Sequence, residues 1–232
     1  MTKDSILYGS SLIEYEIEYV QRKTLGITVH PDGSVTLKAP LESNLEEIRK
    51  KVHHRAAWIL RQKRYFESFG TPTPRRKFIS GESHLYLGRQ YMLRINEGKT
   101  NAVHYQNNIL EVECHNKKEA GKLLQLWYLE RAQIKFPEYA KPIIEQFSAF
   151  KVSPKSLNIR KMEKRWGYCT KNGDIMLNPR LICAPRCCIE YVITHEMCHL
   201  VHRNHTKEFY ALLSKMMPHW ERWKEKLERM MR

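Results

Sequence analysis

Residues 194–205 read Thr-His-Glu-Met-Cys-His-Leu-Val-His-Arg-Asn-His and contain the pattern H-E-x-x-H. On an α-helix, residues four apart lie on one face about 6 Å apart, so the imidazoles of His195 and His199 can reach one metal ion. Zinc accepts histidine nitrogens at about 2 Å, and the intervening Glu lies beside the coordination position that the protein leaves open. The pattern therefore predicts a helix that carries a zinc site.

The residues around this pattern support a helix over 186–201. At about 100° per residue, the apolar side chains cover one broad arc, while His195 and His199 fall on roughly the opposite side. We therefore expect a helix that buries one stripe and presents its histidines to a cleft. The apolar arc consists of Ile189, Val192, Ile193, Met197, Leu200 and Val201.

A catalytic zinc usually has three protein ligands and keeps a fourth position for water, so a third ligand is needed. On an uninterrupted helix His202 would lie about 10 Å along the axis from His195, and the third ligand must therefore follow a turn. Residues 203–204 suit this turn because Asn tolerates the left-handed conformation that ends helices. We favour His205 as the third ligand, with His202 second and Glu208 third.

The predicted reaction is hydrolysis, because zinc lowers the pKa of bound water toward about 7 and Glu196 is placed to act as general base. A further donor would stabilise the oxygen of the electrophile. The candidates for this donor are Tyr168, Arg165 and His202. A strand edge could also align a peptide by main-chain pairing, and we consider residues 174–177 and 157–168 for that role.

Elsewhere the chain alternates between strand and helix patterns, which predicts an α+β protein. Alternating apolar residues over 11–40 indicate strands, with a hairpin turn at Pro31-Asp32-Gly33, and a long amphipathic helix is expected over 45–69. Residues 82–95 and 103–114 are expected to form a second strand group with its turn at Asn107-Asn108. No internal repeat is apparent in the sequence.

The boundary between two halves is expected near residues 115–118. The first half, residues 1–116, would hold the N-terminal strands, the basic helix and the second hairpin. The second half, residues 117–232, would be the catalytic domain, with a small sheet around a turn at 171–174, the helix that carries H-E-x-x-H, and a final helix interrupted at Pro218. Pro137 and Pro142 are expected to break or restart the helix that begins at Lys117.

The chain is strongly basic, with 40 Lys and Arg against 25 Asp and Glu, a formal net charge of +15. Residues 45–78 hold ten Lys and Arg against three Glu, together with Trp58, Tyr65 and Phe66. Basic and aromatic residues together suit nucleic acid, although a charged helix face is more often only solvated. We therefore consider nucleic acid as a partner of this surface.

The first residues lack the apolar core of a signal peptide, and no run approaches the roughly 18 apolar residues needed to span a bilayer. The six cysteines lack the repeated spacing of a secreted disulfide framework. We expect a cytoplasmic protein that does not cross a membrane.

Several short motifs outside the histidine pattern resemble the YgjP-like metallopeptidase family, which is related to the SprT-like proteases. The motifs are Gly81-Glu82, Tyr86–Gly88, Tyr91–Leu93, Arg165–Cys169, Ile175–Asn178, Tyr191–Leu200 and Asn204–Thr206 with Phe209. The resemblance covers nearly the whole chain and implies a zincin-type domain, one zinc ion held by His195, His199 and His205, and Glu196 as catalytic base. The family motif usually reads R-W-G-S-C-S, whereas Tyr168 and Thr170 replace both serines here.

Three functions of different classes follow. The first is an intracellular zinc peptidase, for protein or peptide substrates, with DNA-bound proteins considered because SprT-like enzymes act on them. The second is a metal-dependent nucleotide pyrophosphatase, in which basic residues before Trp166 would neutralise phosphate. Those residues are Arg160, Lys161, Lys164 and Arg165. The third is a DNA-associated binding module with a structural metal, against which Glu196 argues because a structural zinc needs no general base.

Overall fold

The computed structural model describes residues 2–30, 32–68, 76–163 and 165–230. The chain divides into two compact units, residues 1–74 and 75–231, and each unit is described by itself. Both units mix helices with sheets, which confirms the predicted α+β class.

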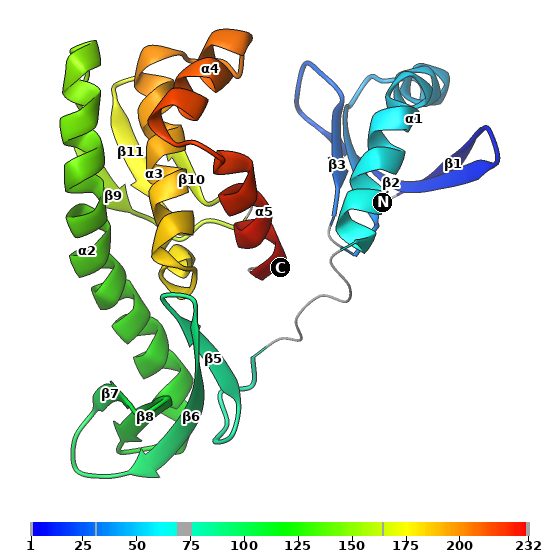
Figure 1. Cartoon of the computed structure of the whole chain (residues 1–232). Helices are drawn as coiled ribbons and strands as arrows, with labels where there is room; N and C mark the ends of the chain where they lie inside the picture. Colours follow the sequence, from blue (N-terminus) through cyan, green and yellow to red (C-terminus); the bar gives the residue numbers. More distant parts are fainter. Residues whose placement is uncertain (1, 31, 69–75, 164, 231–232) are drawn as a thin grey trace. The chain divides into compact units, whose positions relative to one another are not determined.

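The first unit begins with a four-stranded sheet in the order β1-β2-β4-β3 (Figure 1). Strands β1 and β2 form one antiparallel hairpin, β3 and β4 form another, and β2 pairs with β4 in parallel. The hairpin predicted at Pro31-Asp32-Gly33 is confirmed as the β3–β4 pair, although Pro31 itself lies outside the described residues. The strands are β1 Thr2–Tyr8, β2 Ser11–Val20, β3 Gly26–Val29 and β4 Val35–Pro40.

Helix α1, Leu45–Glu67, follows this sheet. Its N-cap is Asn44, whose side chain accepts a hydrogen bond from the amide of Glu46 at 2.8 Å. Such a cap satisfies one of the amides that have no partner within the helix. One stripe of the helix packs with the inward side chains of the strands into a core. The helical part of this core is Ile48, Val52, Ala56 and Ile59, and the strands contribute Ile13, Tyr15, Ile17, Val29, Val35, Leu37 and Ala39.

The second unit also begins with a four-stranded sheet, in the order β5-β6-β8-β7. Here β6 and β8 pair in parallel between two antiparallel hairpins. The predicted turn at Asn107 and Asn108 is confirmed, with φ angles of 49° and 61° that asparagine adopts at little cost. The strands are β5 Ser83–Tyr86, β6 Arg89–Glu97, β7 Ala102–Gln106 and β8 Ile109–Cys114.

The two units therefore share one arrangement of four strands and a helix, although the sequence shows no repeat. In both, two hairpins meet through their parallel second strands, and a helix follows directly. The helical segment is capped each time by an asparagine side chain, Asn44 in the first unit and Asn116 in the second.

The helix of the second unit is longer than predicted. After the 3₁₀ turn η1 (Lys117–Glu119), α2 runs without interruption over Ala120–Phe147 and includes Pro137 and Pro142. The expectation that these prolines break the helix was wrong. Buried residues on both sides of them, such as Phe136 and Phe147, belong to one core and keep the helix continuous despite the missing amide donors.

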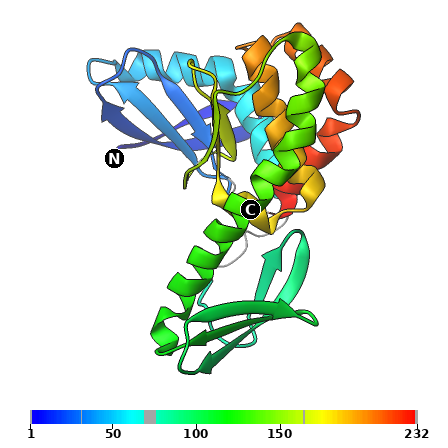
Figure 2. The same ribbon diagram turned by 90° about the vertical axis from the view of Figure 1, so that its left-hand side faces the viewer.

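Figures 1 and 2 show β5–β8 beside the first turns of α2, and the remaining elements along its second half. A small sheet has the order β10-β11-β9, in which β11 pairs antiparallel with β10 and parallel with β9. Helices α3, α4 and α5 complete the unit, so the predicted interruption near Pro218 is confirmed. The elements are η2 Ser148–Phe150, β9 Ser156–Ile159, β10 Gly167–Cys169, β11 Asp174–Leu177, η3 Pro179–Cys183, α3 Arg186–Val201, α4 Lys207–Met216 and α5 Trp220–Met230.

The boundary between the compact units falls between residues 74 and 75, not at the predicted position near residue 116. The reason is that Leu93, Leu110 and Val112 of the second sheet lie in the same hydrophobic core as helices α2 and α3. Across the described ranges, no helix combines the length and the apolar character that a membrane span requires.

Candidate functional site

Helix α3 carries the H-E-x-x-H pattern and begins and ends at the predicted residues. Its surroundings differ from the prediction, because α2, α4, α5, β10 and β11 all pack against it. Instead of one buried stripe, most of its circumference is buried, while His195 and His199 are half-buried. The buried residues are Cys188, Ile189, Tyr191, Val192, Ile193, Thr194, Glu196, Met197 and Cys198.

The chain turns directly after α3. His202 ends the helix in an extended conformation, with φ −124° and ψ 107°, and the backbone bends at residues 203–204. Asn204 does not adopt the left-handed conformation that we expected. Arg203 holds the turn instead, because its guanidinium donates to the carbonyl of Thr170 at 3.1 Å and to that of Lys171 at 2.7 Å.

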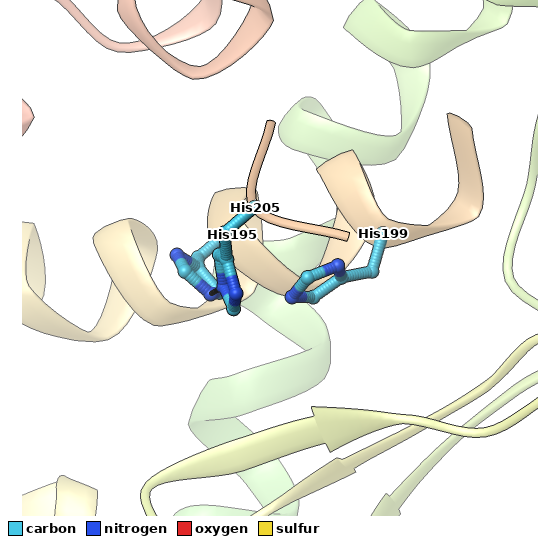
Figure 3. A group of neighbouring side chains, drawn as sticks. All are labelled: His195, His199 and His205. Carbon is cyan, nitrogen blue, oxygen red and sulfur yellow. Dashed lines mark hydrogen bonds between the residues drawn. The ribbon is translucent and has the colours of Figure 1, made fainter. Parts of the chain in front are cut away.

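This turn brings His205 to the two histidines of the helix (Figure 3). The Nε2 atoms of His195 and His205 are 3.0 Å apart, and one ring nitrogen from each of the three residues lies within 4.8 Å of the others. Ligands about 2.0–2.1 Å from a tetrahedral zinc are about 3.3 Å apart, so the three side chains fit one such ion. Within the described chain, no other group of three or more potential ligands has this geometry, and neither His202 nor Glu208 belongs to it.

The backbone of His202 orients one of these ligands. The Nδ1 atom of His199 lies 3.1 Å from the carbonyl oxygen of His202. A carbonyl can only accept, so the proton is on Nδ1 and the Nε2 atom of His199 keeps its lone pair for a metal. Such a hydrogen bond to the second ring nitrogen is typical of histidines that bind metal.

Burial keeps two of the imidazoles neutral, which is the form that binds metal. It lowers the pKa of His195 to about 3, with further lowering from His199 and His205. It also lowers the pKa of His199. The Nδ1 atom of His195 is buried and has no hydrogen-bond partner among the residues that the structure describes.

Phe209 of α4 lies against all three imidazoles and is fully buried. Its ring centroid is 5.0 Å from that of His195, 4.6 Å from that of His199 and 4.7 Å from that of His205. Periodicity alone does not distinguish this residue from other core positions, although it follows the capping residue Thr206 by three. Contact with the phenyl ring restricts the movement of the three imidazoles.

Glu196 lies on the buried side of the same helix, with only 6% of its surface exposed. Burial raises its pKa to about 7, while a hydrogen bond with the backbone of Cys169 and the charge of Arg165 act in the opposite direction. Gly167 is equally close, because a Cβ atom there would lie 3.0 Å from Oε1 of Glu196. Strand β10 therefore forms one wall beside this carboxylate.

The other predicted site residues are less directly connected to Glu196 than Gly167 and Cys169 are. Side chains alternate across a strand, so Tyr168 lies on the face of β10 opposite to Gly167 and Cys169. Arg165 is exposed, as are Arg160 and Lys161, and Lys164 lies outside the described residues. Of the basic residues here that the structure describes, Arg165 is the one whose charge affects the pKa of Glu196.

Strand β11 cannot serve as the predicted free edge, because it is the middle strand of its sheet. Strand β10 is an edge strand, and only every second residue along it forms backbone hydrogen bonds with β11. The amide of Thr170 donates to the carbonyl of Asp174, and the carbonyl of Trp166 accepts from the amide of Asn178. Gly167 and Cys169 therefore direct their backbone groups away from β11, toward the open edge.

Asn178, directly after β11, is a supporting residue for which the sequence predicted no role, although it belongs to the motif Ile175–Asn178. Its side chain is 1% exposed and donates to the carbonyls of Met162 and Arg165, at 2.7 and 2.9 Å. It thus ties the segment before β10 to the end of β11. The signals in the sequence are its place at the end of that motif and directly after a short apolar strand.

Comparison with known proteins gives a family for this chain. The profile described as YgjP-like, metallopeptidase domain, matches residues 23–230. Among solved structures, the metallopeptidase zymogen abylysin of Pyrococcus abyssi aligns at 24% identity with a TM-score of 0.34, over 40% of this chain and 91% of that one. No curated protein matches the chain. Because the family match extends over most of the sequence, the chain belongs to the YgjP-like metallopeptidase family.

Proposed function

We propose that the protein is a zinc-dependent peptidase in which His195, His199 and His205 hold one zinc ion and Glu196 is the general base. The observation that carries this proposal is the convergence of three imidazole nitrogens within 4.8 Å, two from helix α3 and one from the segment after it, beside a buried glutamate of the same helix. A bound zinc ion would lower the pKa of a coordinated water and polarise a carbonyl group.

Glu196 moves the proton in this mechanism. Its carboxylate accepts a proton from the attacking water and returns it to the amine that leaves. A carboxyl group in a buried site, with a pKa raised to about 7, can both accept and donate near neutral pH. Arg165 contributes a positive charge near the same carboxyl and is the candidate for stabilising negative charge on the substrate.

The edge of β10 supports a peptide as the substrate. The backbone groups of Gly167 and Cys169 face the open edge, and Cys169 is also hydrogen-bonded to Glu196. An extended peptide that pairs with this edge would lie beside the catalytic carboxylate. The six cysteines are all free, which suits the reducing cytoplasm, and we propose that location.

The test compares Glu196→Gln with His205→Ala in protein purified without added metal or a metal-binding tag. Metal content is measured by plasma mass spectrometry, and activity is measured with fluorescein-labelled casein. We expect about one zinc per chain in the wild type and in Glu196→Gln, with activity abolished in that variant, and loss of zinc in His205→Ala. His202→Ala is the matched control, because its backbone carbonyl still orients His199 and zinc should remain.

Two results would contradict the proposal. Retention of one zinc per chain in His205→Ala, with loss in His202→Ala or Glu208→Ala, would assign the third ligand elsewhere. Hydrolysis of ATP or UTP that depends on Glu196, without hydrolysis of any protein or peptide, would assign the site to phosphoanhydride chemistry.

A further inference from the structure

The first unit has a groove between the start of β3 and helix α1, far in sequence from the histidine site. It has a volume of about 640 Å³, which is within the usual range of about 300–1,000 Å³ for ligand sites. Its lining residues are Lys23, Thr24, Leu25, Ile27, Lys50, Lys51, His54, Arg55 and Trp58. None of these side chains is acidic.

The helical part of the lining is a single face of α1. Lys51, Arg55 and Trp58 follow one another at intervals of four and three residues, and such residues are neighbours on a helix surface. Lys50 and His54 lie beside them, also four residues apart. All five are exposed. Over these nine residues the helix rises about 12 Å, so the charges form a row instead of a point.

The groove is more basic than the unit as a whole. Residues 1–74 contain 11 Lys and Arg against 9 Asp and Glu, a net charge of only +2. Within the described part of the chain, Lys23, Lys50, Lys51 and Arg55 form no ion pair. Acidic residues of the unit instead pair elsewhere, as Glu16 with Lys3, Glu18 with Lys38, and Asp4 and Glu46 with Arg49.

Trp58 gives the groove an aromatic surface. The core stripe of α1 consists of Ile48, Val52, Ala56 and Ile59, and Trp58 does not belong to it. Its side chain is 38% exposed. Phe66, another aromatic residue of this basic helix, packs against the core and is not available in the same way. Trp58 is therefore the aromatic residue that a ligand in the groove can stack on.

We propose that this groove binds a single-stranded nucleic acid, whose phosphates lie along Lys23, Lys50, Lys51 and Arg55 and one of whose bases stacks on Trp58. A row of cations with an aromatic platform is the arrangement that binds single strands without sequence preference. The carboxylates of an acidic peptide would pair with the cations, but such a peptide has no base to stack on the indole of Trp58. A duplex keeps its bases stacked on one another and cannot offer one to Trp58. The proposal is independent of the peptidase activity.

Binding is measured by fluorescence anisotropy of a fluorescein-labelled dT20 oligonucleotide titrated with the full chain, between 50 and 200 mM KCl. If the four cations each neutralise one phosphate, the slope of log K against log salt is about −3, and the affinity falls about 50-fold over this range. Arg55→Ala should make the slope shallower by about 0.7. Trp58→Ala should weaken binding about tenfold, whereas Trp58→Phe should retain most of the affinity.

The matched control is Arg64→Ala, because Arg64 is also exposed on α1 but lies nine residues from Arg55, half a turn around the helix. It should leave both affinity and slope unchanged. Equal effects of the two arginine variants, or no binding at 50 mM KCl, would overturn the proposal. Tighter binding of a duplex, or equal binding of polyglutamate without an effect of Trp58→Ala, would assign the groove to another class of partner. Casein cleavage should be the same in all these variants.

Discussion

At the scale of single residues, the position of the Glu196 carboxylate depends on the smallest residue near it, Gly167. Gly167 leaves the space that Glu196 occupies, since a Cβ atom would lie 3.0 Å from its Oε1 atom and 3.1 Å from Cγ1 of Val192. Both neighbours belong to the buried helix α3, which cannot move away without disturbing the core. The backbone of Gly167 needs no positive φ, so the requirement is for space alone.

We predict that Gly167→Ala lowers kcat about tenfold to a hundredfold, because it displaces Glu196 by a fraction of an ångström to about an ångström. Zinc content should remain at one per chain, which separates this effect from loss of the ligands. Tyr168→Phe, one residue away but on the other face of β10, should retain at least half of the activity. A large loss in Tyr168→Phe would mean that its hydroxyl contacts the substrate.

Arg203 positions the third histidine through the backbone of the hairpin between β10 and β11. We predict that Arg203→Ala weakens zinc binding about tenfold, as the loss of a residue that supports a ligand usually does. Zinc affinity is measured by competition with a chromophoric chelator. Lys171→Ala is the control, because Arg203 bonds to the carbonyl of Lys171 and not to its side chain. Equal affinities in Arg203→Ala and the wild type would contradict this role.

At the scale of elements, strand β1 is tied to helix α1 by one carboxylate. Arg49 donates to both oxygens of Asp4, at 2.9 and 3.0 Å, and the hydroxyl of Tyr15 donates to the same group at 2.8 Å. These hydrogen bonds lower the pKa of Asp4 to about 2. A carboxyl whose pKa is lowered on folding stabilises the fold above its ordinary pKa of 3.8, and the contribution is lost as the pH falls toward 2.

We predict that Asp4→Asn lowers the local stability of β1 and α1 by about 1 kcal/mol at pH 7, and that the difference from the wild type disappears between about pH 4 and pH 2. Hydrogen exchange of the amides in these two elements measures this effect in the full chain. Glu16→Gln is the control, because the Glu16–Lys3 pair is exposed and should contribute little. A loss of the same size in Glu16→Gln would mean that net charge, not the Asp4 contacts, sets the stability.

Element types were largely predictable, because the periods of strand and helix are visible wherever one face is buried. The range of α3 and the turns at Asn107-Asn108 and near Pro218 followed from local patterns. Helix α2 did not, since the cost of Pro137 and Pro142 is local, whereas the packing that outweighs it involves residues far apart in the chain. The same holds for the sheet order that makes β10, and not β11, the edge.

At the scale of the whole molecule, the three histidines that we propose as metal ligands all belong to the second unit. We therefore predict that removal of the metal by a chelator lowers the thermal stability of residues 76–230 and leaves the first unit unchanged, because only a state that binds the ion is stabilised by it. Hydrogen exchange with and without the chelator should increase in α3 and α4 but not in β1–β4. Increased exchange in both units would show that their stabilities are coupled.

The three histidines could be predicted from the sequence, whereas the contacts that support them could not. Two histidines in H-E-x-x-H define their own distance, and His205 was favoured because a turn had to precede it. The packing of Phe209 and the bonds of Arg203 and Asn178 were not predictable, since they join segments about 10 to 30 residues apart, and a motif that contains a residue does not identify its contacts. The unit boundary was missed for the same reason.

Two hairpins and a helix occur in both units, but the two helices differ in how many of their residues can be substituted without disturbing a core. In the second copy, α2 is committed on several sides to the core that supports the histidines. In the first copy, α1 packs with one stripe only, so substitutions on its outer face leave the fold intact. During evolution, the outer face of α1 can therefore change its residues, and what it binds, without disturbing the core around the histidines.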